Sequence, residues 1–146
     1  MSMNSTEIFI ENFRSFGAAP DPVSYEALFD PDEGTVLHPG MTEPINYKQV
    51  REYMERYLAT IKDFRFEVLS WAEKDSTVFV EAKSTGIVGG EHLSWGIAYC
   101  ITLKGSRVKR GRAYADRIPI LARMFPDMTL RDIAGIAGPA PGLVKK

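Results

Sequence analysis

The feature that most constrains the fold is a change of hydrophobic period at Asp63. Upstream of it, apolar residues recur at the spacing of an amphipathic helix, at Val50, Tyr53, Met54, Tyr57, Leu58 and Ile61. Downstream, apolar and polar residues alternate over residues 64–68 and 78–82, as in a half-buried strand. Helices followed by successive strands predict an α+β fold, in which the helices cover one face of an antiparallel sheet.

Three N-terminal helices are expected before this boundary. Capping-box spacing opens the first at Asn4 and the third at Asn46, and Asp21 followed by Pro22 opens the second. A short strand, Thr35–His38, lies between the second helix and the third. Alternating patterns predict the other strands within residues 64–68, 78–82, 93–103 and 108–117.

The C-terminal segment is apolar, with helical patterns at residues 118–125 and 129–136. No internal repeat or linker divides the chain, so we expect one domain over residues 1–146, with a core at 5–118 and a tail or lid at 119–146. Phe125, Met128 and Leu130 either fill the interior or cover it, and the pattern leaves both alternatives open.

Composition restricts the partners. A formal net charge of −1 on 146 residues argues against nucleic acid and anionic membranes. No stretch approaches the ~18 apolar residues of a membrane span, and no signal-peptide pattern opens the chain, so we expect a cytoplasmic protein. The single cysteine, Cys100, is predicted to be a buried thiol. One cysteine and two widely separated histidines form no metal cluster, and we expect neither metal nor cofactor.

His38 stands where a short apolar strand meets a loop broken by Pro39, Gly40 and Pro44. Imidazole exchanges a proton near neutral pH, so a histidine that faces a pocket suits general acid/base chemistry. A structural histidine, hydrogen-bonded at a strand end, is the alternative.

The order of elements, together with the stretches YEALFDPDEGTVLHPGMTEP and RVKRGRAYAD, resembles the nuclear-transport-factor-2-like superfamily. The resemblance spans about residues 5–118. Within that superfamily, the chain resembles the branch that contains ketosteroid isomerases, SnoaL-like polyketide cyclases and limonene epoxide hydrolases. It implies a cone-shaped, cystatin-like α+β barrel, whose curved sheet wraps three helices and leaves a pocket at the open end. This fold hosts many reactions and also non-enzymes.

The resemblance also implies roles for individual residues. His38 occupies the place of the isomerases' catalytic Asp. Phe13 occupies the place of their oxyanion-binding Tyr but lacks a hydroxyl, while Tyr99 falls near their protonated Asp and can donate one hydrogen bond. Ala113 stands where the epoxide hydrolases have a catalytic Asp. These departures argue against both of those reactions.

Asp116 lies near the last strand, where SnoaL-like cyclases place an acid/base Asp. The resemblance therefore makes Asp116 a third catalytic candidate, beside His38 and Tyr99. A structural ion pair with Arg112 or Arg117 is the alternative interpretation.

If His38 faces inward, strand alternation predicts the rest of a pocket wall. The expected substrate-binding residues are Phe13, Val36, Tyr53, Tyr57, Trp95, Ile97, Gly111, Ala113 and Ala115. The last three are small and leave room for a flat hydrophobic molecule. Tyr53 and Tyr57, like Tyr25, also fit a packed core with a satisfied hydroxyl.

We therefore expect a cofactor-independent enzyme that acts on a hydrophobic cyclic small molecule by general acid/base chemistry, as an isomerase, cyclase or dehydratase. The alternative is a non-catalytic binding module or a dimeric association module of the same fold. The resemblance further implies a homodimer formed through the outer sheet face, which carries Ser94, Ala98, Cys100 and Thr102.

Overall fold

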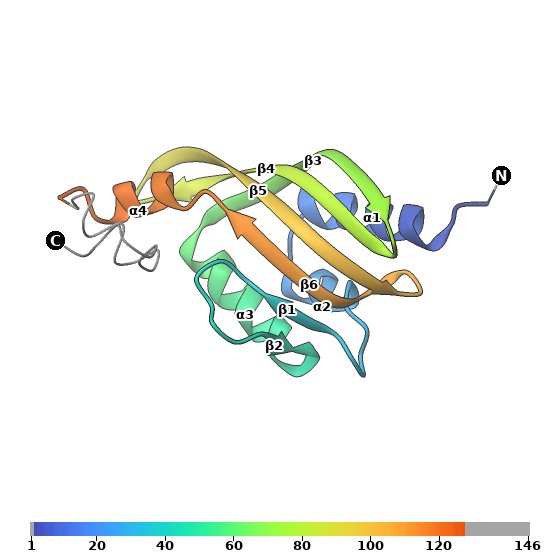
Figure 1. The fold of residues 1–146 in the computed structure, drawn as a ribbon. Coiled ribbons are helices and arrows are strands. Elements are labelled where there is room, and N and C mark those ends of the chain that lie inside the picture. The colour runs from blue at the N-terminus through green and yellow to red at the C-terminus, as the bar shows by residue number, and fades with distance from the viewer. Residues whose placement is uncertain (1, 128–146) are drawn as a thin grey trace, which may run out of the picture.

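Three N-terminal helices, one six-stranded sheet and a short helix after the sheet make up the fold in a computed structural model that describes residues 2–127 (Figure 1). The helices are α1 (Ser5–Ala18), α2 (Pro22–Ala27), α3 (Tyr47–Thr60) and, after the sheet, α4 (Ile118–Met124). The strands are β1 (Thr35–Leu37), β2 (Ile45–Asn46), β3 (Lys62–Lys74), β4 (Thr77–Val88), β5 (Glu91–Lys104) and β6 (Arg107–Ala115). The predicted α+β fold is confirmed. The helical pattern at 129–136 lies outside the described residues.

The strand order is β2-β1-β6-β5-β4-β3. All neighbours are antiparallel except β1 and β6, which run parallel with Val36 opposite Gly111. β2 was not expected, because its two residues lie in a segment whose prolines and glycine predict only a loop. Ile45 of β2 pairs with Val36, so the loop after His38 returns to the edge of β1.

The predicted helix starts are confirmed. The side chain of Asn4 accepts a hydrogen bond from Glu7 N, and Asp21 accepts one from Ser24 N. Asn46 and Gln49 form a complete capping box at the start of α3. No helix within residues 2–127 is long and apolar enough to cross a bilayer.

Strand alternation separates the two faces of the sheet. On β4, Val78, Val80 and Ala82 are buried, whereas Phe79 between them is 47% exposed. The register between β3 and β4 shifts after Val68, and Leu69 is 51% exposed there. A β-bulge of this kind lets β3 continue to Lys74, well beyond the expected 64–68.

α4 lies at the end of the molecule where the β4–β5 turn is found (Figure 1). Arg123 of α4 forms a salt bridge with Glu91 of β5, at 2.6 Å between Nη2 and Oε1. Phe125 is 49% exposed and does not fill the interior. Met128 and Leu130, the other two residues of that prediction, lie outside the described residues.

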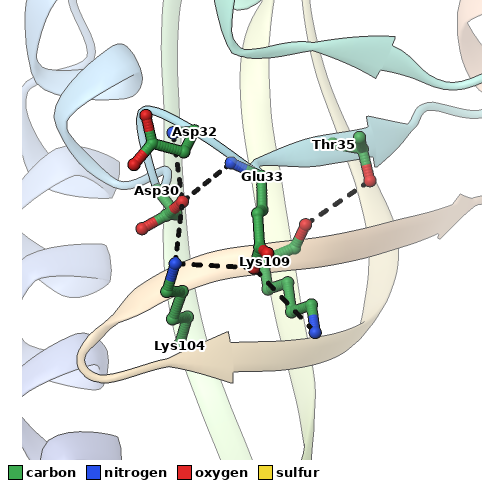
Figure 2. Close-up of polar contacts among 6 residues, drawn as sticks. All are labelled: Asp30, Asp32, Glu33, Thr35, Lys104 and Lys109. Carbon is green, nitrogen blue, oxygen red and sulfur yellow. Dashed lines mark hydrogen bonds and ion pairs between the residues drawn. The ribbon is translucent and has the colours of Figure 1, made fainter.

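A charged cluster holds the chain just before β1 (Figure 2). Asp30 Oδ2 accepts hydrogen bonds from Asp32 N at 3.1 Å and from Glu33 N at 2.8 Å. Lys104 Nζ lies 3.6 Å from Glu33 Oε2, and Lys109 Nζ lies 4.0 Å from the same atom. The cluster ties the start of β1 to the β5–β6 hairpin. The pKa of Asp30 is lowered chiefly by the hydrogen bond from Glu33 N and, to a smaller extent, by the charge of Lys104.

Candidate functional site

Helices α1–α3 and the inner face of the sheet enclose a cavity of about 490 Å³. This volume lies in the range of small-molecule sites, roughly 300–1,000 Å³. The wall is largely aromatic and aliphatic, with Phe9, Phe13, Phe16, Phe29, Phe64, Phe66, Trp95, Ile97 and Ile101. The cavity therefore suits an apolar ligand of one to a few rings.

His38 lies in the cavity wall, one residue after β1 ends. Its Nε2 is 2.6 Å from the hydroxyl oxygen of Tyr25 on α2. Its ring stacks on Tyr53 of α3, with 3.9 Å between the centroids and 10° between the planes. One contact holds the edge of the imidazole and the other holds its face, so its orientation is fixed by two helices.

Burial controls the protonation of this pair. Burial lowers the pKa of His38 to about 4, so the imidazole is neutral at neutral pH. Burial also raises the pKa of Tyr25 well above its usual range, so the phenol keeps its proton. Either Tyr25 donates to Nε2 while Nδ1 carries the imidazole proton, or Nε2–H donates to the phenol oxygen.

Tyr99 reaches the cavity from β5 and meets Phe13 edge to face, at 5.0 Å between ring centroids and 88° between planes. Burial raises the pKa of Tyr99, so its hydroxyl stays protonated and able to donate. Burial likewise raises the pKa of Tyr53 to about 12.

The structure brings most of the predicted site residues to one cavity. The lining includes His38, Tyr99, Phe13, Val36, Tyr53, Tyr57, Trp95, Ile97, Gly111 and Ala115. Ala113 is buried opposite Tyr99 in the β5–β6 register but does not line the cavity.

Asp116 lies apart from these residues. It borders a groove on the outer face of the sheet with Leu69 and Tyr114, and its Oδ1 accepts a hydrogen bond from Ile118 N at 3.1 Å. The expected ion pair with Arg112 or Arg117 is not formed in the described part of the chain. The carboxylate instead orders the backbone where α4 begins.

Sequence reasoning missed two residues of the site. Tyr25 was interpreted only as a core residue, and its contact with His38 becomes visible only once α2 is placed beside β1. Arg117 was considered only as a partner for Asp116, but it lines the cavity. Its guanidinium lies against Gly40, where a Cβ would clash with Nη1. Gly40 has φ 85°, a conformation that glycine adopts without strain.

In the described part of the chain, the charged residues of the lining are all basic. They are Arg56, Arg112 and Arg117, and no Asp or Glu from that part joins them. Arg112 directs its guanidinium to Cys100 Sγ on the outer face, at 3.5 Å. Within residues 2–127, no three His, Cys, Asp or Glu side chains gather as a metal site would require.

The outer face of the sheet is more apolar than its predicted residues suggested. Leu69, Phe79 and Tyr114 are 51%, 47% and 56% exposed. Cys100 is only half-buried there, so the prediction of a buried thiol was wrong, because its strand turns this residue away from the core. Pairing of two copies through this face stays a prediction, which sedimentation equilibrium would test.

No family model matches the chain, and no curated protein matches it. Several solved structures match the chain in fold. AclR from Streptomyces galilaeus, a proposed hydroxylase, aligns with a TM-score of 0.71 at 16% identity, over 93% of this chain and 92% of that one. IdmH from Streptomyces antibioticus, a proposed polyketide cyclase, aligns with a TM-score of 0.69 at 12% identity, over 82% of this chain and 97% of that one.

A protein of ketosteroid isomerase-like fold from Catenulispora acidiphila, solved with trimethylamine, aligns with a TM-score of 0.70 at 16% identity, over 79% of this chain and 90% of that one. At these identities the matches show the fold alone. That fold is nuclear-transport-factor-2-like, of the form found in SnoaL-like polyketide cyclases and ketosteroid isomerase-like proteins.

Proposed function

We propose that the protein is a cofactor-independent enzyme that moves a proton on a hydrophobic cyclic small molecule, by chemistry of the isomerase, cyclase or dehydratase type. One observation carries the proposal. A neutral imidazole, fixed by Tyr25 and Tyr53, faces an aromatic cavity of about 490 Å³. Proteins of the same fold that are proposed polyketide cyclases are consistent with this class of chemistry.

In this mechanism His38 takes a proton from a carbon next to a carbonyl, or delivers one to a leaving hydroxyl. A pKa of about 4 leaves the imidazole free to accept a proton at neutral pH, but it makes the imidazolium costly in the empty cavity. An enolate that forms beside the ring offsets this cost, because an opposite charge raises the pKa of the imidazole. The step uses the tautomer in which Nε2–H donates to the Tyr25 oxygen, so that the lone pair of Nδ1 takes the proton while the contact with Tyr25 keeps the ring aligned.

Tyr99 supplies the second part of the mechanism. Its protonated hydroxyl donates a hydrogen bond to the ligand's carbonyl oxygen, and the bond strengthens as negative charge develops there. Phe13 supports this phenol from the side, through the edge-to-face contact. Asp116 has no part in this proposal, because it lies on the outer face.

A non-catalytic binding module is the second candidate. It is favoured by the lining itself, in which no carboxylate accompanies His38 within residues 2–127. The two candidates differ in one measurable respect. Both bind an apolar ligand, but only the enzyme exchanges the ligand's protons with water.

The experiment has two stages. Thermal shift first finds cavity ligands among steroids, aromatic polyketide-like ketones, terpenoid ketones and epoxides. A ligand at 100 times its dissociation constant adds about 2.7 kcal/mol of stability. NMR in D₂O then measures the exchange of protons next to the carbonyl of each ketone hit. His38→Gln is compared with wild type, and His92→Gln is the matched control, since His92 is exposed and outside the cavity.

We expect wild type and His92→Gln to exchange these protons. We expect His38→Gln to bind the same ketone and to exchange its protons about 10²- to 10⁴-fold more slowly, the usual contribution of a general base. Binding without exchange in wild type supports the binding module. Undiminished exchange in His38→Gln refutes the role of His38.

A further inference from the structure

The cavity lining carries a positive charge that no carboxylate of the described chain pairs with. Of the three lining arginines, Arg56 pairs with Glu52, and Arg112 directs its guanidinium to Cys100 on the outer face. Among residues 2–127, no carboxylate lies within ion-pair distance of Arg117. Asp116, its neighbour in sequence, accepts a hydrogen bond from Ile118 N instead.

Arg117 is placed where a ligand would meet it. It precedes α4, lines the cavity and lies against the backbone of Gly40, in the loop that follows His38. Its charge also reaches the phenol of Tyr53, the ring on which His38 stacks. A guanidinium so placed presents several N–H donors toward the polar end of a bound molecule.

We infer that the cavity selects apolar ring compounds that carry a carboxylate, with the rings among the aromatic side chains and the carboxylate on Arg117. The inference rests on the proposed function, since it names the class of ligand that the same cavity takes. Arginine binds carboxylates in a bidentate manner, which fixes orientation as well as adding affinity. Anchored in this way, a ligand lays its rings among the aromatic side chains of the same lining, which also holds His38.

A matched pair of probes tests the charge alone. Anthracene-2-carboxylic acid and anthracene-2-carboxamide share the ring system and differ in the ionised group. Their affinities are measured by fluorescence titration at neutral pH against wild type, Arg117→Gln and Arg110→Gln. Arg110 is the matched control, because its loss removes the same charge from an exposed residue that does not line the cavity.

We expect wild type and Arg110→Gln to bind the carboxylate about tenfold more tightly than the carboxamide, the scale of one charge-assisted hydrogen-bonded contact. Arg117→Gln should remove the preference and leave the affinity for the carboxamide unchanged. In wild type, added salt should weaken binding of the carboxylate only. This salt dependence tests the inference even if Arg117→Gln does not fold.

Equal affinity of wild type for the two probes, or a preference that survives Arg117→Gln, overturns the inference and leaves the proposed function standing. If neither probe binds and the ligand screen also finds nothing, the cavity takes no apolar ligand and both proposals fail together.

Discussion

The two ends of β1 hold titratable side chains in opposite ways. Before the strand, Asp30 and Glu33 are charged and are balanced by backbone N–H groups and by Lys104 and Lys109 (Figure 2). After the strand, His38 is enclosed by aromatic rings, and its partner is a neutral phenol. Only residues 34–37 separate an ion cluster from a histidine that burial keeps neutral.

The difference shows how surroundings decide what an ionisable group does. Hydrogen bonds and cations lower the pKa of Asp30 by favouring its charged form. Burial lowers the pKa of His38 by penalising its charged form. Asp30 therefore holds the chain in place through its hydrogen bonds and ion pair. His38 keeps a proton affinity that a bound ligand can change.

The largest expected effect is on stability in acid. The folded pKa of His38 is about 4 and the unfolded value about 6.5, so between these pH values only the unfolded chain binds the proton. The stability is fully present above pH 6.5 and is lost as the pH falls toward 4. We expect this residue to account for a loss of about 3 kcal/mol.

Urea unfolding at neutral pH and near pH 4.5 measures this loss for wild type, His38→Gln and His92→Gln. His38→Gln should lose less stability on acidification than the other two proteins, because glutamine does not titrate. Equal losses in all three proteins would mean that His38 titrates normally in the folded state.

A smaller effect is expected for Tyr25→Phe. The substitution keeps the ring but removes the hydroxyl that lies 2.6 Å from His38 Nε2. We expect the free energy of unfolding to fall by about 1 kcal/mol, the net value of one hydrogen bond. Chemical denaturation measures it, and Tyr114→Phe is the control because that ring is 56% exposed on the outer face. An unchanged stability would show that the contact is not formed in solution.

The smallest effect is expected at the other end of the strand. Glu33→Gln removes the carboxylate that faces both Lys104 and Lys109, and these three side chains are about half exposed. Exposed ion pairs contribute little, so we expect a change within about 0.5 kcal/mol that shrinks further in high salt. A loss as large as that of Tyr25→Phe would show that the cluster is far less screened than its exposure indicates.

The elements that sequence predicted well are those with local signals. Asn4 and Asn46 lie three residues from Glu7 and Gln49, and that spacing alone positions a helix start. The alternation in β4 and β5 likewise follows from neighbouring residues. β2 and the bulge at Leu69 have no such signal, because pairing with another strand defines them.

The candidate site divides in the same way. Strand alternation predicted that Trp95, Ile97 and Tyr99 share a face, and all three line the cavity. Tyr25 and Arg117 were missed because their roles arise from contacts with His38 and with Gly40, across different elements. The sequence left open which face Asp116 occupies, and the structure places it just after β6, beside the groove on the outer face.

The parallel pairing of β1 with β6 has a consequence for the order of events during synthesis. Residues 35–37 leave the ribosome early, but their partners at 110–112 belong to the last strand. Until β6 has been made, a nascent chain therefore carries His38 beside a strand whose only sheet partner is β2, and beside an open aromatic surface. Contacts this distant in sequence slow folding, and we expect the cavity to be the last part of the protein to close.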